Sequence, residues 1–352
     1  MKIFYIANVR LPTEKAHGQA IMKMCEAFAS QGVEVDLLVP RRINLIEKET
    51  FDFYDMEKSF EIRRLPCFDL TNYGRIGFFI QWVTFSYMAG IFALFHNADY
   101  YYGRDELSLL LISFFRKRVV WEAHTAKSNW LVKILLSRIQ SLVVISRGLK
   151  SHFYNTAKIG LPIMVAPSAV DLATFDKVSL SKESLRKKLN LPPEHTLIAY
   201  IGKRQTMGED KGVEELEKAY KLIKEKHDRT ELMIVSEVIP KDVPSYMKAA
   251  DILIMNYPNK EHYAKFMSPL KLFEYMASGN AIVVPDLPSI REVVDESVVA
   301  FFEPDDPKSL AFAVGYIIDK PSEAKERARK ALELVKGYTW AERSKKVLEF
   351  MK

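Results

Sequence analysis

Four polar residues in the stretch SPLKLFEYMASGN have the spacing of one helical face. Ser268, Lys271, Glu274 and Ser278 follow one another at intervals of three, three and four, among apolar and aromatic neighbours. Free N–H groups at a helix start favour a phosphate, and a carboxylate one turn deeper can accept two hydrogen bonds from a vicinal diol such as a ribose. The stripe therefore predicts an end-on site for a nucleoside diphosphate. The alternative is a wet helix face with an internal Lys–Glu pair.

Local signals place this stripe on a helix between two strands. Ser268 and Pro269 predict the helix start, with serine as the cap and proline at the first helical position. Gly279 predicts the C-terminal end. The apolar runs at 251–255 and 281–285 predict buried strands on either side.

The rest of the chain repeats this alternation of apolar strands and helices, which is typical of parallel sheets. The expected strands are 3–7, 33–39, 119–121 and 142–145 in the first half, and 197–202, 232–236, 251–255, 281–285 and 298–302 in the second. We therefore expect an α/β protein with two doubly wound Rossmann-like domains that face each other across a cleft. Ligands of such sheets bind beyond the carboxyl ends of the strands.

The loop after the first strand lacks the glycine-rich fingerprint of dinucleotide-binding proteins. Between Asn8 and Met22 there is one glycine, Gly18, where that fingerprint needs three at fixed spacing. The sequence GEDKG at 208–212 does not match the Walker pattern, and no DxD-like metal motif is seen. These observations argue against a dehydrogenase and indicate neither a resident cofactor nor a metal.

The totals suit a protein with sizeable cores: 352 residues, 48% hydrophobic and 12% aromatic. Two cysteines are too few for a disulfide framework or a metal cluster, and Met1 leads straight into a strand without a secretory signal. A cytoplasmic protein is the expectation.

Residues 1–170 hold 21 Lys and Arg against 15 Asp and Glu, so the whole formal charge of +6 lies there. This predicts an anionic partner, such as lipid headgroups or a phosphate-bearing acceptor; the alternative is uneven charge on an ordinary surface.

One segment of this basic half, 76–95, is long enough to span a membrane, but Gln81, Thr84 and Ser86 dilute its apolar character. We expect a helix buried in the first domain; the alternative is a membrane-inserted or membrane-lying helix. Basic residues beside exposed apolar surface favour an anionic membrane face, so peripheral contact with the inner face of a membrane is a further expectation.

Seven pieces of the sequence then follow one another in a recognisable order. They are IANVRLPTEKAHG, WEAH, VISRGLKSHF, VAPSAVD, YIGKRQTMGEDKG, SPLKLFEYMASG with PDLPSIREV, and YTWAERSKKVLEFM. In this order they resemble the family-4 retaining glycosyltransferases of GT-B fold (glycosyl transferases group 1) over nearly the whole chain. The resemblance implies an acceptor-side domain at 1–170, a nucleotide-sugar-binding domain at 171–337, and a last helix, 338–352, that packs back on the first domain.

The resemblance implies that the second domain binds the donor. Glu274 matches the glutamate that holds the nucleotide ribose. Lys211 matches the lysine that contacts the diphosphate, and Lys203 or Arg204 matches its basic companion, although these three could also form a solvated charged loop. The helix start supplies further donor contacts through Ser268, Pro269, Leu270 and Lys271.

In the first domain the resemblance implies two more site residues, and two others are expected on the acceptor side. Gly18 matches a loop glycine whose amide approaches the phosphates, and His124 matches a histidine that reaches the donor sugar. His17 and Arg104 are placed on the acceptor side. The alternatives are a glycine that only permits a turn, a satisfied buried histidine and a surface arginine.

The implied reaction transfers a sugar from a UDP- or GDP-linked donor to an acceptor, with retention at the anomeric carbon and without a metal. The acceptor would be a lipid-linked or polysaccharide glycan precursor, and no nucleic acid is expected as a partner. One departure puts the sugar in doubt, because position 266 is Phe where the family commonly has a second glutamate. The alternatives are a sugar-nucleotide epimerase of the same fold and a catalytically silent binding subunit at the membrane.

Overall fold

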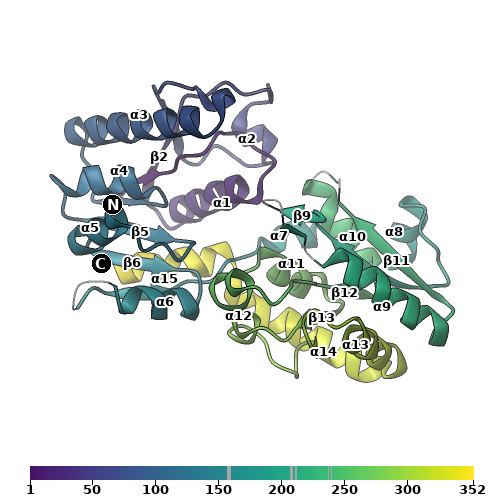
Figure 1. Cartoon of the computed structure of the whole chain (residues 1–352). Coiled ribbons are helices and arrows are strands. Elements are labelled where there is room, and N and C mark those ends of the chain that lie inside the picture. Colours follow the sequence, from purple (N-terminus) through teal and green to yellow (C-terminus); the bar gives the residue numbers. More distant parts are fainter. Residues whose placement is uncertain (157–159, 207–208, 211, 237, 239) are drawn as a thin grey trace. The chain divides into compact units, whose positions relative to one another are not determined.

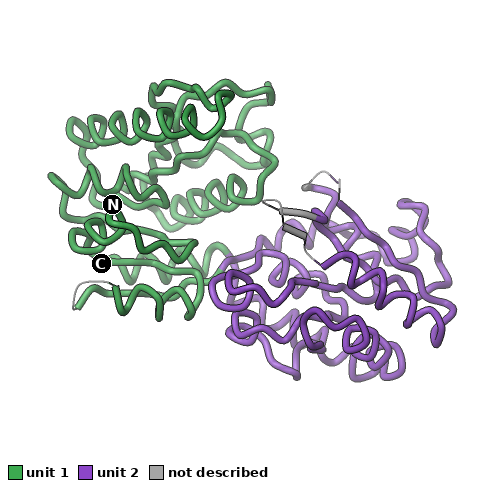
Figure 2. Tube along the Cα trace, in the orientation of Figure 1, with its two compact units in different colours: residues 1–167, 340–352 green, residues 168–339 purple. Residues whose placement is uncertain are grey.

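The chain folds into two compact units. The computed structural model describes residues 1–156, 160–206, 209–210, 212–236, 238 and 240–352. Unit 1 comprises Met1–Pro167 and Trp340–Lys352, and unit 2 comprises Ser168–Thr339 (Figures 1 and 2). The chain therefore leaves unit 1 once and returns to it with its last helix.

Unit 1 is built on a seven-stranded parallel sheet. The strand order is β3-β2-β1-β4-β5-β6-β7, and every neighbouring pair is parallel. Since the order reverses between β1 and β4, the carboxyl ends of these two strands form the switch point of the sheet. The strands are β1 (Lys2–Ile6), β2 (Glu34–Pro40), β3 (Glu61–Leu65), β4 (Tyr100–Gly103), β5 (Val119–Ala123), β6 (Ser141–Val144) and β7 (Ile163–Val165).

Helices cover both faces of this sheet, because successive strand residues point to opposite sides. On one face, Tyr102 of β4 packs edge-on against Phe28 of α1, with 5.5 Å between the ring centroids. On the opposite face, Phe4 of β1 lies 5.4 Å from Phe92 of α3. The last helix, α15, packs beside α1. The helices are α1 (Ala16–Ser30), α2 (Thr50–Phe53), α3 (Gly74–Phe95), α4 (Glu106–Ser113), α5 (Trp130–Arg138), α6 (Arg147–Tyr154) and α15 (Trp340–Met351).

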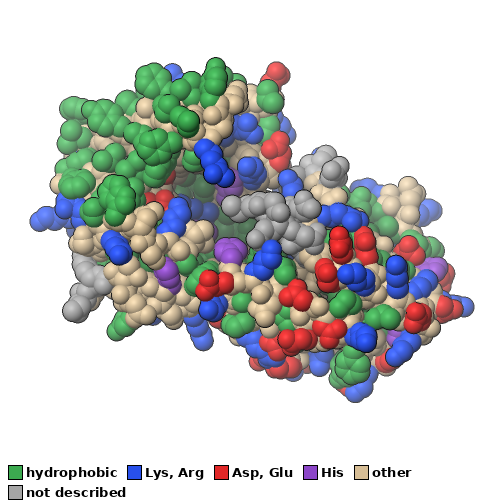
Figure 3. Space-filling view, in the orientation of Figure 1, with side chains coloured by type: hydrophobic (Ala, Val, Ile, Leu, Met, Phe, Trp, Pro, Cys, Tyr) green, Lys and Arg blue, Asp and Glu red, His purple; other side chains and the backbone are tan. Residues whose placement is uncertain are grey.

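The helix expected to be buried at 76–95 is buried on one face only, so that prediction is wrong. The inner face of α3 carries Gly77, Gln81, Phe85 and Ala89 at four-residue intervals. Its outer face is exposed, and hydrophobic side chains gather over this part of unit 1 (Figure 3). By length and composition alone the segment Thr71–Phe95 could cross a membrane, yet only 33% of its most apolar window is buried.

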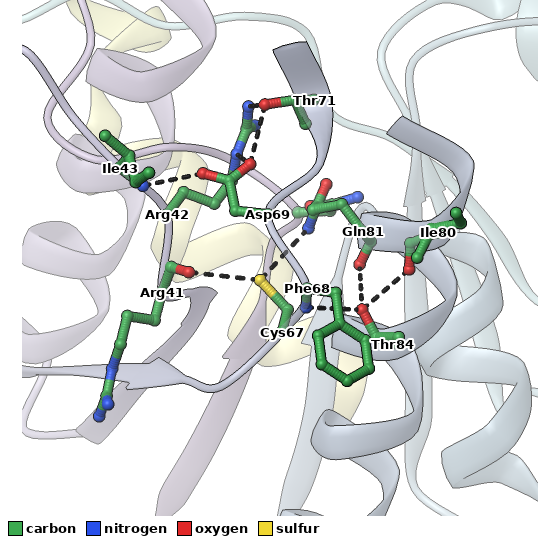
Figure 4. Close-up of polar contacts among 11 residues, drawn as sticks. Arg41, Arg42, Ile43, Cys67, Phe68, Asp69, Thr71, Ile80, Gln81 and Thr84 are labelled. Carbon is green, nitrogen blue, oxygen red and sulfur yellow. Dashed lines mark hydrogen bonds and ion pairs between the residues drawn. The ribbon is translucent and has the colours of Figure 1, made fainter. Parts of the chain in front are cut away.

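Polar contacts fix the inner face of α3 to the loops that follow β2 and β3 (Figure 4). The hydroxyl of Thr84 accepts a hydrogen bond from the amide of Phe68 at 3.1 Å. The thiol of Cys67 donates to the carbonyl of Arg41 at 3.3 Å. Gln81, fully buried, donates to Asn8 at 3.0 Å beyond the carboxyl end of β1. The inner face is therefore held by specific contacts, which leaves the outer face as the free surface of the helix.

Unit 2 has a five-stranded parallel sheet in the order β11-β8-β12-β13-β14 and a separate two-stranded antiparallel ribbon. Here the order reverses around β8, between β11 and β12. The sheet strands are β8 (Thr196–Ile201), β11 (Thr230–Val235), β12 (Ile252–Ile254), β13 (Ala281–Pro285) and β14 (Ala300–Phe302), and the ribbon is β9 (Gln205–Thr206) with β10 (Glu209–Asp210).

Two hydrophobic cores flank the sheet of unit 2. Alternate strand residues divide between them: Ile198 and Tyr200 belong to the core under α9 and α13, and Ala199 and Ile201 to the core under α10, α11 and α14. The helices are α7 (Leu172–Asp176), α8 (Lys182–Lys188), α9 (Val213–Lys226), α10 (Val243–Ala249), α11 (Leu270–Ser278), α12 (Pro288–Arg291), α13 (Pro307–Asp319) and α14 (Pro321–Leu334). The expected α/β class with two doubly wound parallel sheets is confirmed.

Candidate active site

The start of the helix that carries the polar stripe differs from the prediction. Helix α11 begins at Leu270, Pro269 occupies the cap position, and no side chain caps the helix. Ser268 does not cap it because its hydroxyl accepts a hydrogen bond from the amide of Ser168 at 2.8 Å. The hydroxyl of Ser168 in turn donates to the carbonyl of Ser268 at 2.7 Å. Ser268 thus joins two distant segments of unit 2 instead of capping its own helix.

Helix α11 is anchored directly to the switch point of the unit 2 sheet. The hydroxyl of Tyr275, fully buried, accepts from the amide of Ile201 at 3.1 Å and donates to the carbonyl of Ile254 at 3.2 Å. These two backbone groups lie at the carboxyl ends of β8 and β12. The stripe of α11 is therefore fixed at the edge where ligands of doubly wound sheets bind.

Lys271 reaches the loop that follows β8. Its ammonium lies 4.4 Å from the ring centroid of Tyr200. The same ammonium lies against Gly202, which has a φ of +147°, and a Cβ at that position would come within 3.0 Å of Lys271 Cε. Because Gly202 has no side chain, the ammonium of Lys271 can approach the backbone at the end of β8.

Glu274 is the residue of the stripe whose side chain is available to a ligand. It is half-buried, and among the described residues no group forms a hydrogen bond or ion pair with its carboxylate. Burial raises the pKa of Glu274 above its ordinary value, and the charge of Lys271 offsets only part of that effect. Ser278, at the far end of the stripe, donates to the carbonyl of Tyr275 at 2.7 Å. The carboxylate is therefore the stripe's free acceptor, with an ammonium nearby.

The basic residues expected near the diphosphate have different environments. Lys203 is exposed beyond β8, and Arg204 forms an ion pair with Glu217 of α9 at 3.1 Å. Lys211 lies outside the described residues. Its neighbour Gly212 has a left-handed φ of +75° at the start of α9 and its carbonyl accepts a hydrogen bond from the buried amide of Asn256. The prediction of a diphosphate site at these residues stays a prediction.

In unit 1, Gly18 and His17 lie in the first turn of α1 and not in the preceding loop. The amide of Gly18 donates to the carbonyl of Lys15 at 3.0 Å. A Cβ on Gly18 would lie 2.6 Å from the hydroxyl of Tyr54, which is locked by hydrogen bonds to the backbone of Thr13. The structure thus explains this glycine by close packing, and its predicted contact with a phosphate stays untested.

Arg104 and His124 follow the neighbouring strands β4 and β5 and share one partner, Glu122. Oε1 of this fully buried carboxylate lies 3.0 Å from Nη2 of Arg104 and 2.6 Å from Nε2 of His124. Arg343 of α15 adds a second guanidinium at 3.2 Å, and the hydroxyl of Tyr102 donates to Oε2. Arg104 is thus largely buried in a charged cluster and is not the surface arginine considered from the sequence. Its Nε has no hydrogen-bond partner among the described residues.

Sequence reasoning missed Glu122, Arg343, Asn256 and Tyr275. A charged residue inside the apolar run VVWEA is a signal that could have identified Glu122. Arg343 is 221 residues from Glu122, so only the fold brings the two together. Across the described part of the chain, no three His, Cys, Asp or Glu residues are grouped to hold a metal ion.

Residues 236–320, which include β12, α11 and β13, match the family described as glycosyl transferases group 1. Over 68 residues the chain is 41% identical to the putative teichuronic acid biosynthesis glycosyltransferase TuaH of Bacillus subtilis. That stretch covers 19% of this chain and 17% of the length of TuaH. The predicted resemblance to group 1 glycosyl transferases is therefore confirmed.

Solved structures extend the likeness to the whole chain. Sucrose-phosphate synthase of Thermosynechococcus elongatus has a TM-score of 0.75 at 16% identity, covering 99% of this chain and 97% of its own. HepE of Anabaena, solved in complex with UDP-glucose, has a TM-score of 0.71 at 13% identity, covering 99% and 98%. At such identities the likeness establishes the fold, and the chain has the GT-B fold.

Proposed function

We propose that this protein is a retaining glycosyltransferase that uses a UDP- or GDP-linked sugar as donor. The observation that carries the proposal is Glu274, a half-buried carboxylate with no hydrogen bond among the described residues, one helical turn from the ammonium of Lys271. A diol needs two acceptors and a diphosphate needs positive charge, and α11 holds both at the switch point of the sheet. The group 1 match over the same segment and the UDP-glucose bound by HepE support this donor class.

In the proposed reaction the bond between the anomeric carbon and the diphosphate oxygen breaks, and its electron pair stays on the leaving phosphate. The acceptor hydroxyl oxygen forms the new bond to the same face of that carbon, and its proton passes to the leaving phosphate oxygen. Lys271 and the helix start stabilise the growing negative charge, together with Lys203 or Arg204 and Lys211. Since cationic side chains can neutralise the charge of a diphosphate and backbone amides can donate hydrogen bonds to it, we propose that no metal is required.

We further propose that the acceptor is a glycan precursor linked to lipid at a membrane surface. TuaH is named as a putative teichuronic acid biosynthesis glycosyltransferase, which favours a polysaccharide or lipid-linked acceptor here. Unit 1 holds 25 Lys and Arg against 17 Asp and Glu, a formal charge of +8. An anionic bilayer is therefore the partner that matches both its charge and its exposed apolar surface.

The proposed membrane-facing surface is the outer face of α3. Large apolar side chains stand on it with helical spacing, including Ile76, Phe79, Val83 and Tyr87, and Ile76 is 76% exposed. Exposed Arg75 lies at one end of the helix. Lys117 and Arg118 are exposed in the segment that Arg116 ties to the other end through the carbonyls of Ala93 and Leu94. An apolar helix face with basic ends is typical of helices that lie in a membrane interface.

Co-sedimentation with liposomes tests this surface. Wild-type protein should sediment with anionic vesicles at low salt, less at high salt, and little with neutral vesicles. Phe79→Glu should abolish the association, whereas Phe312→Glu, a matched change of an exposed phenylalanine in unit 2, should not. No binding at low salt, or an equal loss in both variants, would favour a soluble acceptor.

A thermal-shift panel of UDP, GDP, ADP and their sugars tests the donor site. A nucleotide present at about 100 times its Kd should stabilise the protein by about 2.7 kcal/mol through mass action. Product analysis of the stabilising nucleotide sugar then separates the classes. Consumption without acceptor indicates an epimerase, binding without turnover in the presence of membrane lipid acceptors indicates a silent subunit, and acceptor-dependent release of nucleoside diphosphate supports transfer.

A further inference from the structure

The cluster around Glu122 decides the protonation of His124. Oε1 of Glu122 lies 2.6 Å from Nε2 of His124. The same oxygen lies 3.0 Å from the guanidinium of Arg104 and 3.2 Å from that of Arg343. Burial alone would raise the pKa of Glu122, but the two guanidiniums and His124 hold it well below its usual range. Since this carboxylate is ionised, it can only accept hydrogen bonds. The short contact therefore places the ring proton of His124 on Nε2.

A second proton on His124 would be unfavourable. Two guanidiniums already share one carboxylate, so a charged imidazole would add a third cation to a cluster with one anion. Burial and Arg104 lower the pKa of His124 to about 4, although Glu122 acts in the opposite direction. The other titratable groups that face this cluster come from β1, α1 and β4, and burial raises the pKa of each: Tyr5, Cys25 and Tyr102. Because these groups are neutral, the balance of one negative and two positive charges is unchanged.

We propose that Glu122 is a positioning residue that fixes His124 as the neutral Nε2–H tautomer, so that Nδ1 serves as a hydrogen-bond acceptor. Among the described residues no group bonds to Nδ1, and the His124 side chain is 33% exposed beyond the end of β5. The ligand that such a nitrogen takes is a hydroxyl group, and not a phosphate oxygen, which itself only accepts. On the proposed function, this hydroxyl belongs to a sugar substrate, and the hydrogen bond to Nδ1 fixes its orientation.

Nitrogen NMR tests the tautomer without any need for activity. The protein is labelled with ¹⁵N at its seven histidines, and long-range ¹H–¹⁵N spectra report the protonation of both ring nitrogens. The signals of His124 are those that disappear in His124→Gln. We expect a protonated Nε2 and an unprotonated Nδ1 from pH 6 to pH 8. A ring protonated on Nδ1, or on both nitrogens at pH 7, would overturn the proposal.

A double-mutant cycle tests whether Glu122 acts through His124. His124→Ala should lower kcat/KM for the nucleotide sugar about 10-fold, the value of one hydrogen bond of about 1.4 kcal/mol, and leave the affinity for the free nucleoside diphosphate unchanged. In the background of His124→Ala, the further change Glu122→Gln should cost no more kcat/KM. Additive losses would refute a positioning role.

The variant Glu122→Gln leaves two buried guanidiniums with no anion, and a loss of this kind can prevent folding. In that case the tautomer in wild-type protein and in Glu122→Asp, which keeps the charge, decides the question. A neutral Nε2–H ring in a protein that turns over no nucleotide sugar would sustain this inference and reject the proposed function. A cationic ring in an active transferase would do the reverse.

Discussion

The substitution Glu274→Gln should strengthen the fold while it weakens the binding of the nucleotide. The change keeps the size and shape of the side chain and removes its charge. In the free protein the Glu274 carboxylate is half-buried without a hydrogen bond among the described residues, and burial raises its pKa. The neutral amide is therefore easier to accommodate than the carboxylate when no ligand is present.

The expected gain in stability depends on pH in a defined direction. The ordinary pKa of this group is 4.5, and the folded protein raises it, so the ionised form lowers the free energy of unfolding once the pH rises above 4.5. Removing a charge that burial disfavours is worth on the order of 1 kcal/mol, which corresponds to a rise in Tm of about 2–4 °C. Below pH 4.5 both side chains are neutral and the difference should disappear.

The expected loss in binding follows from the same unpaired oxygens. A charged acceptor contributes about 1.5–3 kcal/mol to a hydrogen-bonded complex, so the affinity for the nucleoside diphosphate should fall about 10- to 150-fold. Calorimetric titration measures the affinity, and thermal melts at pH 4 and pH 7 measure the stability. The matched control is Glu194→Gln, the same change at an exposed residue of unit 2, which should alter neither quantity.

The result that would refute this reasoning is a Glu274→Gln variant with a lower Tm at pH 7 and normal nucleotide affinity. Such a protein would use Glu274 as a structural group that is satisfied by its own chain. A fall in affinity with an unchanged Tm would keep the binding role but show that the carboxylate is well solvated in the free protein.

Four further changes have defined outcomes. Gly202→Ala should weaken nucleotide affinity more than it lowers Tm, because the new Cβ displaces the flexible ammonium of Lys271; an unchanged titration would show that this ammonium does not meet the ligand. Gly18→Ala should lower stability by about 1–3 kcal/mol in a denaturant melt, because Thr13 and the locked Tyr54 hydroxyl leave no room; a normal melt would contradict the packing argument. Lys211→Ala should lower kcat more than it weakens donor binding, whereas a loss confined to affinity would contradict that role. Activity should persist in EDTA, and loss that is restored by Mg²⁺ or Mn²⁺ would reject the metal-free reaction.

The sheets were predictable wherever a strand is buried on both sides, because such strands are continuous apolar runs. The five strands of the unit 2 sheet were identified in this way, whereas the two-residue strands β9 and β10 were not. Three strands of unit 1 were missed, and each lacks that signal. β3, with the sequence EIRRL, is an edge strand whose Arg63 pairs with Asp36 at 3.1 Å, β4 is the short aromatic run YYYG, and β7 has three residues.

The candidate site was predictable only where its contacts are local. The spacing of Lys271 and Glu274 on one helix is a property of the sequence, and both lie on α11 as expected. The start of that helix was wrong because Ser268 bonds to Ser168, 100 residues away. Arg343, which pairs with Glu122, was missed for the same reason, since it comes from the last helix of the chain.

Glu122 and Glu274 show how one residue type serves two purposes in this fold. Both are removed from water to some degree, yet the fold lowers the pKa of one and raises the pKa of the other. Glu122 has its oxygens occupied by two guanidiniums, an imidazole and a phenol, so it can orient a neighbour but has no capacity left for a ligand. Glu274 has that capacity, since among the described residues nothing in the free protein bonds to its carboxylate. A side chain whose bonds are completed only by a ligand reduces stability until the ligand binds, and on this ground we propose binding for Glu274 and orientation for Glu122.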